Sequence, residues 1–398
     1  MSERARSVSI PNLFAGSLTE LMHPPAGQIP FLDGLRSIAI LLVVSGHLSY
    51  DFATRYGSTV YSRLPFVANG WIGVDLFFVL SGFFIGGQLW KEQMRRGTVD
   101  VGRFMLRRGF RIWPLYYFFF VAVLSVALIL GTAPKTYGWS DLVFLTNYVN
   151  HGIVEGSWSL CTEEQFYIVT PLAIYFFARH LRAVERCRPW LWALLCLVPL
   201  LRAAIWIHGT GHFFTHDAQL FSPIYYRSIT HCDGLIIGLI VANLWETRAR
   251  PQSKVANPWL LVLFGTFALV ALHVLQKEIF DFTGLALFFG SFVWLGVQRK
   301  VAVFDSRLFY WISRLSFGMY LNHEYIAPWV VGRILPHLGL SRSHLFANLL
   351  GVVVLATISA AVALVTFCLV EHPFLQLRKI VLAKPTRAPA GDFTAVTR

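Results

Sequence analysis

The sequence predicts an all-α membrane protein, a polytopic bundle of about ten transmembrane helices with both termini in the cytoplasm. Three observations lead to this prediction. Hydrophobic residues make up 56% of the 398 residues and charged residues only 14%, whereas a soluble domain carries about 25% charged residues. Apolar runs repeatedly reach the ~20 residues that a membrane helix needs. The connections between these runs alternate between rich and poor in Lys and Arg.

The apolar runs divide the chain into ten expected spans. These are 31–51, 69–90, 112–132, 163–178, 190–207, 226–245, 258–276, 282–297, 309–329 and 345–370. The two tails and the loops on their side hold 24 Lys and Arg residues, and the opposite loops hold six. By the positive-inside rule, the side that holds 24 is cytoplasmic. The net charge of +13 is therefore a topology signal, and no nucleic-acid partner is expected.

The expected domain division has three parts. Residues 1–30 form a cytoplasmic tail without the apolar core and cleavage site of a signal peptide. Residues 31–374 form the transmembrane domain, and residues 375–398 form a basic, flexible cytoplasmic tail. The five cysteines have neither a CxxC pair nor a zinc spacing, so buried free thiols are expected.

The first span carries three ionisable residues, Asp33, Arg36 and His47. A charge at the centre of the membrane costs ~2.5 to 3.5 kcal/mol on insertion scales. Arg36 and His47 are eleven positions apart, so on a helix they lie within about 20° of one face and about 16 Å apart in depth. Polar groups at such a depth usually mark function, although bonding between helices is the simpler alternative.

Asp75 begins the second span at the outer level of the membrane, where it can pair with a cation or cap the helix. The small residues that follow, among them Ser81 and Gly82, indicate that another helix approaches closely.

Four arginines precede the third span on the cytoplasmic side. Arg103, Arg107 and Arg111 are spaced i, i+4, i+8, so a helix presents them as one stripe, with Arg108 beside them. Such a stripe can bind a phosphorylated ligand or anionic lipid headgroups. Positive-inside topology alone explains any single arginine, but explains four within nine residues less well.

Two acids open the fourth span. Glu163 and Glu164 come shortly after Trp158 and Ser159, at the outer level where His47 is expected. A carboxylate beside an imidazole fixes its tautomer and raises its basicity, so one of the two acids is expected to orient His47 as a general base. The alternative is a first helical turn whose acids complement the helix dipole.

Two further histidine patterns are less informative. His208, His212 and His216 share the i, i+4, i+8 spacing, but two glycines between them argue against a regular helix, and no metal is expected. His323 lies deep in the ninth span. By itself it is more typical of a hydrogen-bonded core histidine than of a catalyst.

Taken in order, these motifs resemble the membrane-bound acyltransferase 3 family. The matching blocks are Phe31 to Ser37 with His47, Gly73 to Gly82, Arg107-Arg108 with Arg111 to Pro114, Trp158-Ser159-Leu160 with Glu163 to Tyr167, Ser316 to His323, and Glu371 to Phe374. They span nearly the whole chain and together are highly specific. Spans five to eight match none of these blocks, so acceptor choice is expected to lie there.

The resemblance implies an O-acyltransferase of the plasma membrane, the inner membrane of a bacterium. An acyl group, commonly acetyl, would move from cytoplasmic acyl-CoA to a hydroxyl of an exported carbohydrate, lipid or macrolide. The resemblance further implies that His47 is essential and that Arg36 serves the donor. The expected site comprises the catalytic residues His47, Glu163 and Glu164, the acyl-CoA ligands Arg36, Arg107, Arg108 and Arg111, and the supporting residues Asp33, Asp75, Trp158, Ser159, Ser316, His323 and Glu371.

Two alternatives stay open at this point. A covalent acyl-His47 intermediate could replace direct transfer. A proton-coupled transporter also suits intramembrane charges and a central histidine. Against the transporter, the sequence has no matching pair of Gly- or Pro-broken segments in its two halves.

Overall fold

The structure of the protein, a computed structural model, describes residues 10–24, 27–57, 69–132, 138–149, 152–177, 183–214, 223–248, 258–299, 301–340 and 345–383. All regular secondary structure in these ranges is helical, which confirms the all-α prediction for them.

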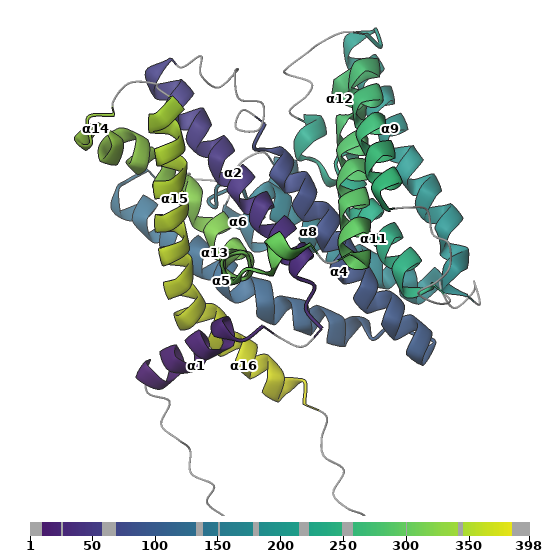
Figure 1. Cartoon of the computed structure of the whole chain (residues 1–398), viewed down its shortest axis with the longest axis horizontal. Coiled ribbons are helices and arrows are strands. Elements are labelled where there is room, and N and C mark those ends of the chain that lie inside the picture. Colours follow the sequence, from purple (N-terminus) through teal and green to yellow (C-terminus); the bar gives the residue numbers. More distant parts are fainter. Residues whose placement is uncertain are drawn as a thin grey trace, which may run out of the picture.

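The long helices follow the order of the expected spans. They are α2 (Pro30–Tyr56), α4 (Ile72–Arg96), α5 (Val101–Ile129), α8 (Ser157–Phe177), α9 (Arg188–Thr210), α11 (Asp233–Glu246), α12 (Pro258–Gln298), α13 (Arg307–Trp329) and α15 (Leu345–Thr366). The short helices are α1 (Ile10–Met22), α6 (Gly138–Leu142), α7 (Thr146–Val149), α14 (Leu335–His337) and α16 (His372–Val381). Single turns of 3-10 helix are η2 (Val184–Cys187), η3 (Ser228–Thr230) and η4 (Ala302–Asp305), and turns of π-helix are η5 (Val330–Ile334) and η6 (Phe367–Glu371). Helices α2, α13 and α15 form one group and α9, α11 and α12 another, and α4 joins them (Figure 1).

Six of the described helical segments are long and apolar enough to cross a membrane. These are α2, α4, α5, α9 with its preceding turn, α12, and α15 with its continuation to Val381. Helices α8, α11 and α13 do not qualify. The 14 residues of α11 extend only about 21 Å, and α8 and α13 carry polar residues of the site such as Glu163 and His323. The expected count of ten therefore stays a prediction.

The seventh and eighth expected spans are the two arms of α12. Gln276 has the non-helical angles φ −168° and ψ 101°, so the helix bends there. A Cβ atom built on Gly284 would lie 3.1 Å from the Cα atom of Leu269, and one on Gly265 would lie 3.1 Å from the Cα atom of Phe288. The arms therefore run antiparallel against each other, with a tight turn between the expected spans 258–276 and 282–297.

Helices α4 and α11 meet backbone to backbone. A Cβ atom on Gly82 would lie 2.2 Å from the carbonyl oxygen of Leu235, and one on Gly238 would lie 2.2 Å from that of Val79. Such contact requires small residues at the interface. The predicted role of Gly82 in close helix approach is confirmed.

A buried ion pair ties α9 to α11. The Arg202 guanidinium contacts the Asp233 carboxylate in bidentate geometry, at 2.6 Å and 3.0 Å, and both side chains are fully buried. Arg202 also donates to the carbonyl oxygens of Thr230 and Ile279. The second of these contacts links the pair to α12.

Several helix boundaries differ from the prediction. Helix α11 begins at Asp233 rather than at 226, because the 3-10 turn η3 precedes it. Helix α8 begins at Ser157, so Glu163 and Glu164 lie beyond its first turn. A helix dipole acts mainly within the first turn, so the dipole does not explain these two acids.

The two tails are partly helical. In α1, Glu20 pairs with Arg314 of α13, with 3.4 Å between Nη2 and Oε1. Helix α16 extends to Val381 and so into the segment from 375 onward that was expected to be a flexible tail. Leu375 is buried against Leu21 and Phe367, which explains the order of α16. Residues 384–398 lie outside the described ranges.

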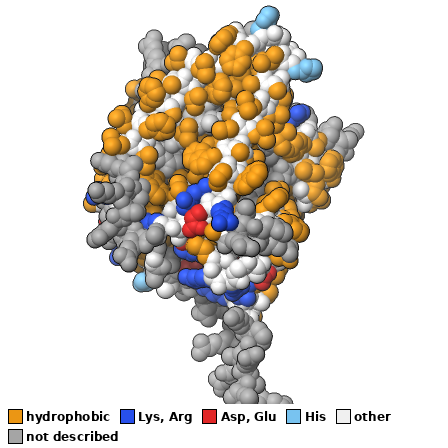
Figure 2. All heavy atoms as spheres, turned by 90° about the vertical axis from the view of Figure 1, so that its right-hand side faces the viewer, with side chains coloured by type: hydrophobic (Ala, Val, Ile, Leu, Met, Phe, Trp, Pro, Cys, Tyr) orange, Lys and Arg blue, Asp and Glu red, His pale blue; other side chains and the backbone are white. Residues whose placement is uncertain are grey.

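The surface separates apolar from charged regions. Hydrophobic side chains cover most of the face on the side of α9 and α12, and Lys, Arg, Asp and Glu gather mainly towards its lower end (Figure 2). Helices α1 and α16 lie at that same end (Figure 1).

Candidate functional site

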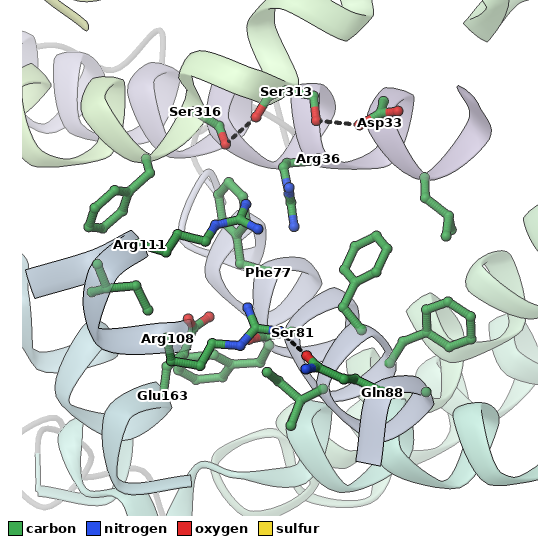
Figure 3. A pocket seen from close by; sticks show the side chains of 18 of the residues that line it. Asp33, Arg36, Phe77, Ser81, Gln88, Arg108, Arg111, Glu163, Ser313 and Ser316 are labelled. Atoms are coloured by element: carbon green, nitrogen blue, oxygen red, sulfur yellow. Dashed lines mark hydrogen bonds between the residues drawn. The ribbon is translucent and has the colours of Figure 1, made fainter. Parts of the chain in front are cut away.

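A cavity of about 700 Å³ lies among α2, α4, α5, α8 and α13 (Figure 3). This volume falls within the ~300–1,000 Å³ that is usual for small-molecule sites. Its charged lining residues are Asp33, Arg36, Lys91, Arg108, Arg111, Glu163, Glu246, Arg314 and Glu371. Lys91 pairs with Glu246 at 3.2 Å, at the C-terminal ends of α4 and α11, and its side chain is half exposed. The cavity therefore opens to the surface near these helix ends.

Three guanidinium groups point into the cavity. Figure 3 shows Arg36 entering from α2, and Arg108 and Arg111 entering from α5. Arg36 lies over the ring of Phe84, 5.1 Å from its centre, and Arg108 donates to Gln88 at 3.3 Å. None of the three forms an ion pair within 4.0 Å with another residue in the described ranges. They are suited to bind an anionic ligand.

Arg107, which was predicted beside them, does not line the cavity. Its Nη2 atom lies 3.4 Å from Oε2 of Glu92, and Arg103 donates to the carbonyl oxygen of Leu382 at 2.8 Å. The stripe expected on the helix forms on α5, but only Arg111 of that stripe reaches the cavity. Arg108, three positions earlier, lies on the same side as Arg111.

Glu163 and Glu164 have different surroundings. Glu163 lines the cavity and accepts a hydrogen bond of 2.7 Å from the Tyr167 hydroxyl. Glu164 is buried, and its Oε2 atom accepts from the Trp113 indole at 3.0 Å. The expectation that one of these acids orients His47 is wrong, because the described carboxylate that contacts His47 is another one.

That carboxylate belongs to Glu324 on α13. The His47 Nε2 atom lies 3.0 Å from Oε1 of Glu324. On the other side of the ring, Nδ1 lies 3.0 Å from Nε2 of His323 and 3.1 Å from the carbonyl oxygen of Val43. The His47 side chain is 42% exposed, so a substrate can reach it. Glu324 was not among the residues predicted from the sequence. An ionisable residue inside an expected membrane span, directly after His323, is a signal of the same kind as Asp33.

Tyr320 lies between the cavity and this histidine cluster. It lines the cavity together with Ser159, and its hydroxyl contacts the Ser159 hydroxyl at 2.5 Å. Its ring centre is 5.7 Å from that of His323. A Cβ atom on Gly156 would lie 2.7 Å from Glu324 and 3.6 Å from the Tyr320 hydroxyl, so both side chains border this glycine. One end of the cavity and His47 are therefore neighbours.

Asp141 of α6 fixes the segment that leads into α8. Its carboxylate accepts from the backbone N–H groups of Ile153 and Val154, at 2.8 Å and 3.2 Å, and from the Tyr116 hydroxyl at 3.2 Å. Burial raises the pKa of the Asp141 carboxyl, and these three donors oppose the rise. The anchored segment leads to Gly156 and so to the boundary between cavity and histidine cluster.

A serine hydroxyl of α13 links this helix to α2 along the cavity wall, and a second serine bonds within α13. The Ser313 hydroxyl donates to Asp33 at 2.7 Å, and the Ser316 hydroxyl donates to the Ser313 carbonyl oxygen at 2.8 Å (Figure 3). Glu371, from the π-turn η6, lines the same cavity. Asp33, Ser316 and Glu371 thus line the same cavity as Arg36.

Asp75 lies apart from the cavity and pairs with His231. Their side chains are buried, with 2.9 Å between Oδ1 and Nε2, and His231 Nδ1 lies 2.7 Å from the carbonyl oxygen of Tyr225. Trp158 stacks on the His231 ring, with ring centres 5.7 Å apart. The partner of Asp75 is therefore a histidine that nothing in the local sequence distinguishes.

The histidine cluster also places three potential metal ligands within 4.8 Å of one another. His47, however, directs Nδ1 to His323 and Nε2 to Glu324, and these two directions diverge. The two rings do not aim their lone pairs at one point, so the arrangement suits a hydrogen-bonded chain better than a cation. Of the regularly spaced histidines, His208 lies near the end of α9, and His216 lies outside the described residues.

Residues 29–368 match the acyltransferase domain of the acyltransferase 3 family. The chain belongs to this family. The resemblance carried by the sequence motifs is confirmed, and the chain is an acyltransferase by family.

Several curated proteins are similar to this chain, among them the following three. Peptidoglycan O-acetyltransferase OatA of Listeria monocytogenes is 25% identical over 325 residues, which cover 74% of this chain and 49% of the relative. O-acetyltransferase OatA of Staphylococcus aureus is 29% identical over 242 residues, 57% of this chain and 36% of the relative. The putative peptidoglycan O-acetyltransferase YrhL of Bacillus subtilis is 25% identical over 327 residues, 74% of this chain and 48% of the relative. The chain thus spans about half or less of the length of these relatives. No solved structure matches it.

Proposed function

We propose that the chain is an integral-membrane O-acyltransferase that moves an acetyl group from acetyl-CoA to a hydroxyl of a carbohydrate acceptor. The observation that carries the proposal is the position of Tyr320. This residue lines a cavity that contains three guanidinium groups without an ion-pair partner in the described ranges. It also packs against His323, which hydrogen-bonds to His47. A donor in the cavity would therefore have its reactive end beside a candidate base.

The cavity suits acyl-CoA because its lining changes character along its length. The nucleotide end of CoA carries phosphate groups, for which Arg108, Arg111 and Lys91 offer charge-assisted hydrogen bonds. The pantetheine arm and the thioester are uncharged and would extend past Arg36 towards Tyr320. Glu163 then acts on the donor side, beside the arginines, and Glu164 supports α8 through its bond to Trp113.

In the proposed reaction, the pair of His47 and Glu324 takes the proton of the acceptor hydroxyl. The oxygen attacks the thioester carbonyl carbon, a C–O bond forms and the C–S bond breaks. The proton then passes to the leaving sulfur, so that an ester and free CoA result. A covalent acyl-His47 intermediate would use the same nitrogen, and would appear as labelled protein when acceptor is omitted.

The proposal includes the sidedness of the reaction. In this proposal the protein lies in the bacterial plasma membrane and has ten spans. Its transmembrane domain covers 31–374, and both termini are in the cytoplasm. The bias of 24 to six in Lys and Arg supports this orientation, as do the charged side chains at the end of α1 and α16. Acyl-CoA would enter from the cytoplasm, and the acceptor would reach the exposed side of His47.

A peptidoglycan-type glycan is the proposed acceptor class, because two of the similar relatives carry peptidoglycan in their names. A lipid or macrolide hydroxyl is the alternative acceptor. The test uses the full chain in lipid nanodiscs with radiolabelled acetyl-CoA and peptidoglycan oligosaccharides. Free CoA and an acceptor heavier by one acetyl group are the expected products, and both should disappear in the His47→Ala variant.

A proton-coupled transporter would behave differently in the same preparation. It would yield no acetylated product, and the chain in sealed vesicles would carry protons when a solute gradient is applied. Transport without product would refute the proposed function.

A further inference from the structure

His323 is completely buried and faces two backbone oxygens. Its Nδ1 atom lies 3.1 Å from the carbonyl oxygen of Met319 and 2.8 Å from that of Tyr320. A carbonyl oxygen accepts hydrogen bonds and cannot donate them. The Nδ1 atom of His323 must therefore carry a proton.

The other nitrogen of His323 is then the one without a proton. Within the described ranges, no carboxylate lies within 4.0 Å of this ring, and its remaining polar contact is with His47. A buried charge without a partner is costly, so the ring is neutral and carries a single proton. The Nε2 atom of His323 presents a lone pair towards Nδ1 of His47, at 3.0 Å.

This fixes the tautomer of His47. Its Nδ1 atom faces two acceptors, the lone pair of His323 and the carbonyl oxygen of Val43 at 3.1 Å. A neutral His47 ring therefore holds its proton on Nδ1. Nε2 is then the nitrogen that can accept a proton, and at 3.0 Å it accepts the hydrogen bond of the Glu324 carboxyl in its protonated form. Nε2 is also the atom beside Glu324, on the partly exposed side of the ring.

We infer that His323 is a positioning residue that accepts the Nδ1 proton of His47 and thereby makes Nε2 the basic nitrogen. The inference rests on the proposed function, in which His47 takes the proton of the acceptor. In Ser-His-Asp sites a carboxylate performs this task. Here a neutral imidazole performs it without adding a second charge to an apolar interior, which leaves Glu324 free to act at Nε2.

A matched pair of substitutions separates this task from a packing role. His323→Gln keeps an amide that can accept from His47, whereas His323→Leu has a similar bulk and no acceptor. We expect His323→Leu to lower kcat by on the order of 100-fold, within the range that general-base catalysis contributes, with little change in KM for acetyl-CoA. His323→Gln should recover most of kcat. His337→Leu, at an exposed histidine of α14, is the control for substitution of a histidine and should leave kcat unchanged.

The tautomer itself is measured by NMR of protein labelled with ¹⁵N-histidine, at an alkaline pH at which imidazole is neutral. The signal lost in the His47→Ala variant belongs to His47. In the wild type it should have the pattern of a protonated Nδ1 and a bare Nε2, and in His323→Leu it should become a mixture of both tautomers. A protonated Nε2 in the wild type, or wild-type kcat in His323→Leu, would overturn the inference. Absence of all turnover in the wild type would instead refute the proposed function, because the NMR pattern does not depend on it.

Discussion

Replacing Arg108 or Arg111 with Gln should weaken acetyl-CoA binding, and the same replacement of Arg107 should not. Arg108 and Arg111 enter the cavity, whereas Arg107 contacts Glu92 outside the cavity lining. A hydrogen bond to a charged group contributes about 1.5–3 kcal/mol, which corresponds to a factor of ~10 to 150 in Kd. Because both cavity arginines are only partly buried, we expect the lower part of that range, about 10- to 30-fold for each.

Arg107→Gln is a matched control, since it removes the same guanidinium from the same helix. Its ion pair is partly exposed and such pairs contribute about 0–1 kcal/mol, so the Kd of the donor should change by less than about threefold. The measurement is isothermal titration of acetyl-CoA into purified protein in nanodiscs at constant salt. If Arg107→Gln and Arg108→Gln weaken acetyl-CoA binding equally, the arginines act through the general positive potential around α5. The assignment of the cavity to the donor would then lose its support.

Three further outcomes are expected. His47→Ala should abolish acetyl transfer while acetyl-CoA still binds with wild-type Kd in the same titration; residual turnover near the wild-type rate would remove His47 from the mechanism. Gly82→Val should lower the free energy of unfolding by at least ~1–3 kcal/mol, because a Cβ atom there meets a backbone oxygen of α11 at 2.2 Å. A Cβ atom on Gly102 has its nearest neighbour at 3.8 Å, so Gly102→Ala should be close to neutral in the same thermal unfolding assay. In a protein whose exposed native cysteine has been replaced, Thr98→Cys should react with an impermeant maleimide only from the cytoplasmic side. Leu338→Cys should react only from the outside. The reverse pattern would contradict the proposed orientation.

The positions of the long helices follow from the sequence because they depend on short-range patterns. Apolar runs placed the long helices, and motifs identified Arg36, Ser316 and Glu371, which the structure brings to one cavity. Boundaries were less accurate where local turns decide them, as at the 3-10 turn before α11. A hydrophobicity pattern contains no information on such a turn.

The pairing of side chains could not be predicted, because it depends on how distant helices pack. His47 and His323 are separated by 276 positions, and Asp75 and His231 by 156. The prediction assigned Glu163 or Glu164 to His47 from their expected depth, but depth does not specify which helix faces which. The same limit explains why Arg107 was expected in the donor site but does not line the cavity. Periodicity predicts the stripe on α5, but the side on which the cavity lies is set by the packing of α2 and α13.

The bidentate pair of Arg202 and Asp233 has an evolutionary consequence. Loss of either partner leaves the other charge in an apolar interior and costs about 3–5 kcal/mol, whereas replacement of both by apolar residues of similar volume is close to neutral. A protein with only one of the two substitutions is therefore less stable than the protein with both residues or with neither. The effect of a substitution at Arg202 depends on whether Asp233 has also changed. Among relatives of this chain, the two positions are expected to change together, so that selection acts on them as one unit rather than as two sites.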